Sequence, residues 1–323
     1  QEAPQTEPEK EEKYAPAVDF AAPLRPEDAY LRIAAKRGAG FACPALPAAA
    51  AAVGIIIFSK KKEKKMSAKI KVFTFNLRVE AKVDGINIFD NRRGRILDTI
   101  REYSPDVIGF QEANDKMREW LIDSLSDYFV VGCGRLGDWR GESTVLAFKK
   151  HMFEMISLEN RWLSATPDIP GSTFGGDQSS CPRMFTAVLL KHREAEKPFI
   201  FLNTHLDHKG AVARLLGAVE IMQYLSEKGY HFVITGDMNA RPDAREIAAF
   251  TDFAPCGSAV VDATEKLGGT FHAFGKLEVP VKIDYIFTDM PCDTDESFIV
   301  SNEPIDGVYI TDHCPVCSFV TAE

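Results

Sequence analysis

The sequence feature that most restricts the fold is a series of short apolar runs, rich in β-branched and aromatic residues, beginning near residue 69. Each run is four to eight residues long and is bounded by polar, Gly or Pro residues, a pattern typical of buried β-strands. The runs are residues 70–76, 107–111, 144–148, 186–190, 199–204, 232–235 and 281–288. The sequence therefore predicts a domain whose core consists mainly of strands.

Helices are fewer, and two of them are clear from apolar residues at helical spacing. One covers residues 93–103 and ends before Pro105, and the longest covers residues 211–228. Gly229 follows the second helix, where glycine commonly caps a C-terminus. Many strands with few helices favour two packed sheets flanked by helices, in an α/β or α+β layered domain.

The first 65 residues differ in composition from the rest. Residues 1–40 are rich in Glu, Pro and Ala, which predicts a disordered leader. Residues 41–58 are apolar and precede a basic run at 60–65, which resembles a short membrane anchor, but prolines leave too short a stretch to span a bilayer. We therefore expect a leader at 1–65, a catalytic domain at 66–323 and a cytoplasmic protein, with a membrane tether as the less favoured alternative.

Charge restricts the kind of substrate. The whole chain has a formal charge of −9, and residues 66–323 hold 27 Lys/Arg against 38 Asp/Glu. Long duplex DNA would be repelled by such a domain unless basic groups gather at its site. A small or single-stranded substrate fits better, with a bound cation neutralising part of the charge.

Polar residues follow several of the apolar runs, where a buried position would be costly unless the groups converge on a common site. These segments are residues 73–78, 108–112, 201–207, 233–239, 283–287 and 311–316. Among them, Glu112, Asp237, Asn239 and Asp312 offer carboxylate and amide oxygens, the ligands that Mg²⁺ prefers. Histidines in the same segments complete an acid–base set, so the pattern indicates metal-assisted hydrolysis of a phosphate ester.

The ordered series of these segments resembles the endonuclease/exonuclease/phosphatase superfamily over residues 69–321. The resemblance implies a four-layered α/β sandwich with two central mixed β-sheets flanked by helices. Residues 162–167 and the downstream Arg183 are similar to the bacterial, deadenylase-like branch. The implied cofactor is Mg²⁺, with Mn²⁺ as the alternative.

The resemblance also assigns roles to the metal-binding and water-activating residues. Glu112 is implied as the principal metal ligand, with Asp312 and Asn76 completing the site directly or through water. Asp237 would orient and deprotonate the attacking water, and Asn239 would hold the phosphate.

The two histidines are implied to work with carboxylate partners. His313 would contact a phosphate oxygen and be held protonated by Asp284, and His205 would be positioned by Glu142. Arg183 is expected to bind the substrate phosphate.

Several alternatives stay open from the sequence. His208, Arg214 and Phe174 are equally consistent with contacts to substrate and with ordinary structural positions. The expected partner is a phosphate-ester substrate, either a small molecule or a single-stranded nucleic acid, and no stable protein partner is evident. Competing functions are a membrane-tethered lipid phosphodiesterase of the sphingomyelinase type and a non-catalytic binding module of the same fold.

Overall fold

A computed structural model describes residues 66–255 and 257–323. The predicted leader, its apolar segment and the membrane tether lie outside these described residues. Within them, no helix is long and apolar enough to cross a membrane.

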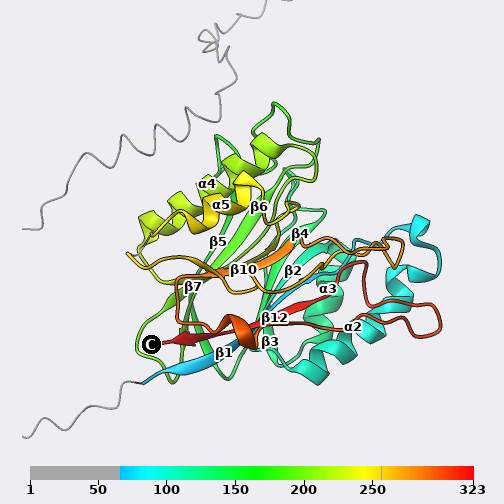
Figure 1. Cartoon of the computed structure of the whole chain (residues 1–323), viewed down its shortest axis with the longest axis horizontal. Coiled ribbons are helices and arrows are strands. Elements are labelled where there is room, and N and C mark those ends of the chain that lie inside the picture. The colour runs from blue at the N-terminus through cyan, green and yellow to red at the C-terminus, as the bar shows by residue number, and fades with distance from the viewer. Residues whose placement is uncertain (1–65, 256) are drawn as a thin grey trace, which may run out of the picture. The chain divides into compact units, whose positions relative to one another are not determined.

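Two six-stranded mixed sheets form the centre of the domain (Figure 1). The first sheet has the order β11-β12-β1-β2-β4-β3, and the second has the order β5-β6-β7-β8-β10-β9. The first comprises β1 (Ala68–Asn76), β2 (Val107–Ala113), β3 (Tyr128–Val131), β4 (Ser143–Lys149), β11 (Phe298–Ile299) and β12 (Val316–Ala322). The second comprises β5 (Phe153–Trp162), β6 (Met184–His192), β7 (Phe199–His205), β8 (Phe232–Asp237), β9 (Val261–Asp262) and β10 (Asp284–Thr288).

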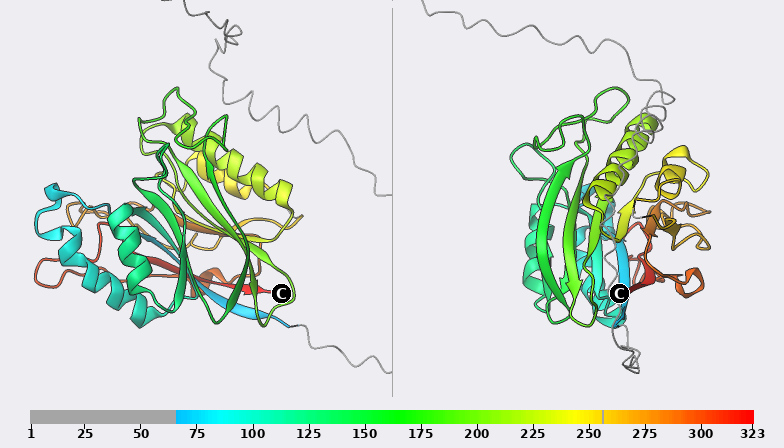
Figure 2. Two further views of the ribbon diagram at one scale, coloured as in Figure 1. Left: turned by 180° about the vertical axis from the view of Figure 1, so that it is seen from behind. Right: turned by 90° about the vertical axis from the view of Figure 1, so that its left-hand side faces the viewer.

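Helices cover the outer face of each sheet (Figures 1 and 2). Helices α2 (Phe89–Tyr103) and α3 (Asp115–Ser124) pack on the first sheet, and α4 (Ala211–Lys228) and α5 (Arg245–Thr251) pack on the second. Two short 3₁₀ helices, η1 (Lys82–Asn87) and η2 (Thr294–Glu296), complete the elements. The structure confirms the four-layered α/β sandwich that the resemblance implies.

The strands are apolar almost throughout because the inner strands are buried on both faces. On β1, Phe73 and Phe75 pack against the helices, whereas Ile70 and Val72 face the other sheet. Successive strand residues point to opposite faces, so a strand between two buried layers has a continuous apolar run.

All seven predicted strands and both predicted helices are present. Helix α4 ends at Lys228, and Gly229 follows it with a φ of 70°, as the glycine cap requires. The sequence did not indicate β5, because most of this edge strand is not buried and its residues lack an apolar run. The short helices α3 and α5 were also not predicted.

A buried polar layer lies between the sheets. Asn203 on β7 donates to the carbonyls of Phe110 and Val145 on the opposite sheet, and its Oδ1 accepts from Gln111 at 2.6 Å and from Thr235 at 3.1 Å. Asn203 and Gln111 belong to the polar segments that follow the predicted strands, yet they lie inside the sandwich and hold its two sheets in register.

Candidate active site

The side chains of the site follow from the two-residue period of the strands. On β7 and β8, residues that face the other sheet change from apolar to polar to ionisable along the chain. The series on β8 is Val233, Thr235 and Asp237, and β7 ends in the same way at His205. Because β7 and β8 are parallel and pair His205 with Asp237, both side chains reach the same open end of the sandwich.

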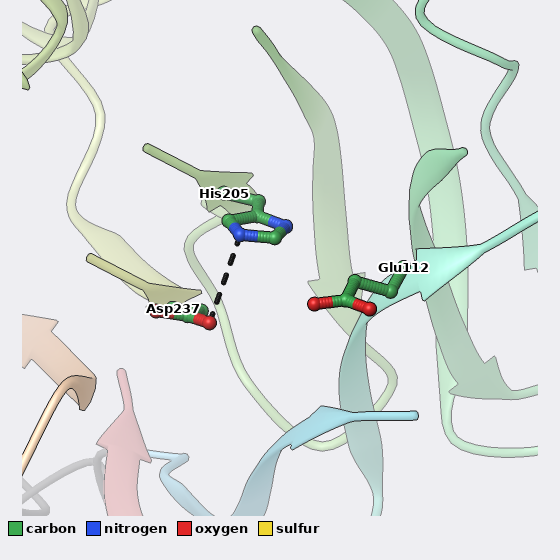
Figure 3. A group of neighbouring side chains, drawn as sticks. All are labelled: Glu112, His205 and Asp237. Atoms are coloured by element: carbon green, nitrogen blue, oxygen red, sulfur yellow. Dashed lines mark ion pairs between the residues drawn. The ribbon is translucent and has the colours of Figure 1, made fainter. Parts of the chain in front are cut away.

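Glu112 reaches this end through a β-bulge. Alternation along β2 would place it on the helix-facing side with Phe110. The pairing of β2 with β4 shifts between Phe110 and Ala113, and Glu112 has a φ of 61°, in the left-handed region. Bulges commonly redirect a side chain in this manner. As a result, Glu112 faces His205 and Asp237 across the cleft (Figure 3).

Asn76, at the end of β1, joins two of the carboxylates. Its Nδ2 atom donates to Glu112 Oε1 at 3.1 Å and to Asp237 Oδ2 at 2.9 Å. Its Oδ1 atom accepts from the backbone N–H of Arg78 at 2.9 Å. In this arrangement the amide bridges the carboxylates through nitrogen, so its predicted role as a metal ligand requires either the free lone pair of Oδ1 or an intervening water.

Asp237 lies between the two histidines. Its Oδ2 atom is 3.6 Å from His205 Nε2 and 3.7 Å from His313 Nε2. Its Oδ1 atom accepts from the backbone N–H of Asn239, which follows in a turn with a φ of 48°. Burial, followed by the neighbouring charge of Asp284, raises the pKa of Asp237.

His313 and Asp284 form the predicted ion pair. His313 Nδ1 lies 2.8 Å from Asp284 Oδ2, both side chains are buried, and the imidazole packs on Phe271. Burial disfavours the charged imidazole, but the carboxylates of Asp284, Asp237 and Asp312 outweigh it and raise the pKa of His313 to about 10. His313 is therefore a cation at neutral pH.

His205 has the opposite charge state. Asn239 Nδ2 donates to the carbonyl of Leu206 at 3.1 Å, which fixes the orientation of the amide, and it also lies 3.0 Å from His205 Nε2. Nε2 must therefore accept, which leaves the proton on Nδ1. Burial and then the charge of Arg183 lower the pKa of His205 well below its ordinary value, so His205 is neutral.

The predicted pairing of His205 with Glu142 is wrong as a direct contact. In the part of the chain that the structure describes, no hydrogen bond or ion pair joins the two residues, although both line the same cleft. Glu142 Oε1 instead accepts from Arg135 Nη2 at 2.8 Å. Arg135 and Glu142 face each other across the β3–β4 hairpin, where Arg135 N–H also donates to the Glu142 carbonyl, so the arginine is the nearer partner.

Asp312 has a basic partner that no sequence pattern marks. Arg78 binds Asp84 through two hydrogen bonds of 3.0 Å, and its Nε atom lies 3.8 Å from Asp312 Oδ2. Beneath it, the buried Arg92 of α2 donates to the carbonyls of Leu77, Arg78, Asn87 and Ile310. This buried guanidinium ties the end of β1 to the loop that carries Asp312.

The cleft has a volume of about 340 Å³ and includes a basic end. Arg183, predicted to bind substrate, lines this end, as does His208, whose Nδ1 atom lies 3.0 Å from Arg183 Nη2. Arg214 points elsewhere and pairs with Glu246 on α5 at 2.6 Å. From the loop that follows residue 170, Cys181 lines the cleft, whereas Phe174 is half-buried outside this lining.

The acidic end suits a divalent cation. Glu112, His205 and Asp237 have ligand atoms within 4.8 Å of one another. Burial and the charge of Glu112 both raise the pKa of Asp312, and Glu112 also contributes to the raised pKa of Asp237. A cation between these carboxylates would relieve their mutual repulsion, and hard oxygen ligands of this kind fit Mg²⁺ or Mn²⁺.

Fold and site together define the class of the protein, a layered α/β hydrolase of phosphate esters. The chain belongs to the Endonuclease/Exonuclease/phosphatase family, whose model matches residues 73–313.

Solved structures with the same fold support this assignment. An endonuclease/exonuclease/phosphatase from Bacteroides vulgatus is 26% identical, with a TM-score of 0.70 over 79% of this chain and 100% of its own. The mannosyl-6-phosphatase of Bacteroides thetaiotaomicron is 25% identical, with a TM-score of 0.66 over 78% and 99%. TDP2 of D. rerio, solved with a single-strand DNA product, shares the fold at 21% identity, with a TM-score of 0.59 over 78% and 99%.

Proposed function

We propose that this chain hydrolyses phosphate mono- or diesters with the help of a bound divalent cation, Mg²⁺ or Mn²⁺, and that its substrate is small or single-stranded. The observation that carries the proposal is the position of Asp237, with Oδ2 3.6 Å from His205 Nε2 and 3.7 Å from His313 Nε2, beside Glu112. A carboxylate, a neutral imidazole and a charged imidazole thus converge on one point at the floor of the cleft.

Each residue has a distinct task in this scheme. Asp237 orients the attacking water and accepts its proton. His313, held protonated by Asp284, donates a hydrogen bond to a phosphate oxygen as negative charge develops there. His205 holds the phosphate on the opposite side through its Nδ1–H, and Asn239, whose two Nδ2 hydrogens are donated to Leu206 and His205, positions the imidazole before substrate arrives.

The cation would be held by Glu112 and Asp312, with Asn76 positioning Glu112. When bound, it supplies charge that polarises the phosphate and offsets its repulsion from the carboxylates. A small substrate is favoured because the described domain is acidic, and the phosphatase of Bacteroides thetaiotaomicron offers a precedent at similar sequence distance.

The test is hydrolysis of p-nitrophenyl phosphate and bis-(p-nitrophenyl) phosphate with Mg²⁺, Mn²⁺ or EDTA. We expect activity that requires the metal and that falls by about 10²-fold or more in Asp237→Asn. Activity that persists both in EDTA and in Asp237→Asn would refute the mechanism. Asp262→Asn, a carboxylate paired with Lys282 away from the cleft lining, is the control.

A further inference from the structure

The basic end of the cleft contains an arginine whose hydrogen-bonding capacity is only partly used, by the contact of Nη2 with His208. The Arg183 side chain is 5% exposed, and its Nε and Nη1 atoms have no hydrogen-bond partner among the residues described. Leaving buried donors of a charged group unpaired is costly, and an acceptor that comes from outside the chain is one arrangement that removes this cost.

The neighbouring carboxylate does not supply that acceptor. Asp207 comes no closer to Arg183 than 3.6 Å. Its two oxygens accept from the N–H and hydroxyl of Ser179 and from the N–H groups of Lys209 and Gly210. These four bonds occupy Asp207 in shaping the turn, and Arg183, which lines the cleft, is left with two unpaired donors.

A second arginine lies beside the first. Arg135 lines the same part of the cleft, and its charge acts together with burial to lower the pKa of Arg183. Neither arginine lies within ion-pairing distance of Glu112, Asp237 or Asp312 in the described chain. Arg135 pairs with Glu142, and Arg183 has Asp207 at 3.6 Å, but the two guanidinium groups still lie close together in a partly buried cleft, an arrangement that an added oxyanion would stabilise.

We propose that Arg183 and Arg135, with His208 beside them, form a second anion subsite, so that the preferred substrate carries a further phosphate next to the one that is hydrolysed. This inference rests on the proposed function, because the acidic end takes the reacting phosphate and the basic end takes its neighbour. The cleft that both ends line has a volume of about 340 Å³, which suits a compact bisphosphate or the first two phosphates of a single strand.

The experiment compares substrates that differ by one phosphate, with Mg²⁺ or Mn²⁺ present. Adenosine 3′,5′-bisphosphate is set against adenosine 3′- and 5′-monophosphate, and the dinucleotide pApA against ApA. We expect the extra phosphate to raise kcat/KM about tenfold or more, mainly through KM. A gain confined to the nucleoside bisphosphate indicates a small substrate, and a gain confined to pApA indicates a single strand. If the extra phosphate changes kcat/KM in neither pair of substrates, the proposed subsite is overturned.

Variants assign the effect to the two arginines. Arg183→Gln and Arg135→Gln should each reduce the preference for the extra phosphate. The control is Arg140→Gln, which should leave this preference unchanged, because Arg140 lies in the same β3–β4 hairpin as Arg135 but its side chain is 74% exposed. A preference that survives in both variants would contradict the inference. Arg135→Gln keeps the test decisive if the more buried Arg183→Gln fails to fold.

Calorimetric binding separates this inference from the proposed function. Adenosine 3′,5′-bisphosphate, titrated with Mg²⁺ into Asp237→Asn protein, should bind about tenfold more weakly when Arg135→Gln is added. If no ester is hydrolysed but this difference is found, the proposed function fails and the subsite stands. If hydrolysis occurs and the affinities are equal, the subsite fails and the function stands.

Discussion

At the scale of single residues, the site depends on two histidines that neighbouring groups hold in different charge states. His313 is charged because three carboxylates surround it, and His205 is neutral because it is buried near arginines and accepts from Asn239. Similar environments would give both imidazoles the same charge, so the difference in charge is what allows the distinct roles that we propose for them.

Replacement of Asp284 tests the charge of His313. Asp284→Asn keeps the shape of the side chain but removes the charge 2.8 Å from Nδ1, so we expect kcat to fall by about 10²- to 10⁴-fold. The matched control is Asp289→Asn, because Asp289 is also buried, also pairs with a histidine at 2.9 Å and lies just after the same strand, β10. Comparable losses of kcat in both variants would show that the effect is only structural.

Glu220 on α4 makes stability depend on pH. Its Oε2 atom accepts from Ser164 N–H, its Oε1 atom has no partner within the described residues, and burial raises its pKa from 4.5 to about 8. The folded protein therefore binds more protons here than the unfolded chain between these values. This contribution makes the protein less stable as pH rises through that window.

Glu220→Gln removes the charge and should remove this contribution. We expect the variant to unfold at a higher urea concentration than the parent at pH 8.5, by about 1 to 3 kcal/mol in unfolding free energy, and at a similar concentration at pH 4.5. Urea titrations at the two pH values measure the difference. An equal shift at both would mean that ionisation of Glu220 is not the cause.

At the scale of elements, the close approach of the two sheets depends on a glycine. A Cβ atom on Gly109 of β2 would lie 2.0 Å from Thr235 Oγ1 and 2.6 Å from Asn203 Oδ1. Both atoms belong to the buried polar layer that joins the sheets. The glycine therefore allows this layer to form directly behind the residues of the candidate site.

Gly109→Ala should force the sheets apart and cost about 3 kcal/mol of unfolding free energy, because a methyl group cannot be accommodated without breaking the polar layer. Gly94→Ala, in helix α2, meets nothing within 4 Å and should instead stabilise the protein by up to about 1 kcal/mol. Urea unfolding of both variants measures this contrast, and a neutral Gly109→Ala would show that the sheets adjust easily.

At the scale of the whole molecule, a cation bound at the acidic end, as we propose, would couple its binding to folding. Glu112, Asp237 and Asp312 come from β2, β8 and the loop before β12, so their carboxylates gather only in the folded chain. A cation that binds this site and not the unfolded chain stabilises the fold, by about 2.7 kcal/mol at a concentration 100 times Kd.

Thermal unfolding in EDTA and in increasing Mg²⁺ or Mn²⁺ measures this coupling. We expect Tm to rise with metal concentration in the parent and to rise much less in Glu112→Gln. Asp262→Asn should respond like the parent, since its carboxylate pairs with Lys282. A Tm that does not change with either metal in the parent would argue against a resident cation at this site.

The layered fold and most members of the site can be predicted from the amino-acid sequence alone. Apolar runs buried on both faces indicate the inner strands, and the polar residues that follow these runs include Glu112, His205, Asp237 and His313 of the cleft and Asn76, which bonds to two of its carboxylates. Such features are local, because a strand and the side chain at its end can be read from a few consecutive residues.

Which of these polar groups come into contact depends on the tertiary structure. It placed Asn203 between the sheets, redirected Glu112 through a bulge and paired Glu142 with Arg135. The position of Asn203 depends on contact between segments far apart in sequence. The direction of Glu112 depends on one bulge, and the Glu142–Arg135 pair depends on the conformation of one hairpin loop. No periodic pattern in the sequence records these features. The basic end of the cleft has the same origin, because Arg135 and Arg183 become neighbours only when the two sheets pack together.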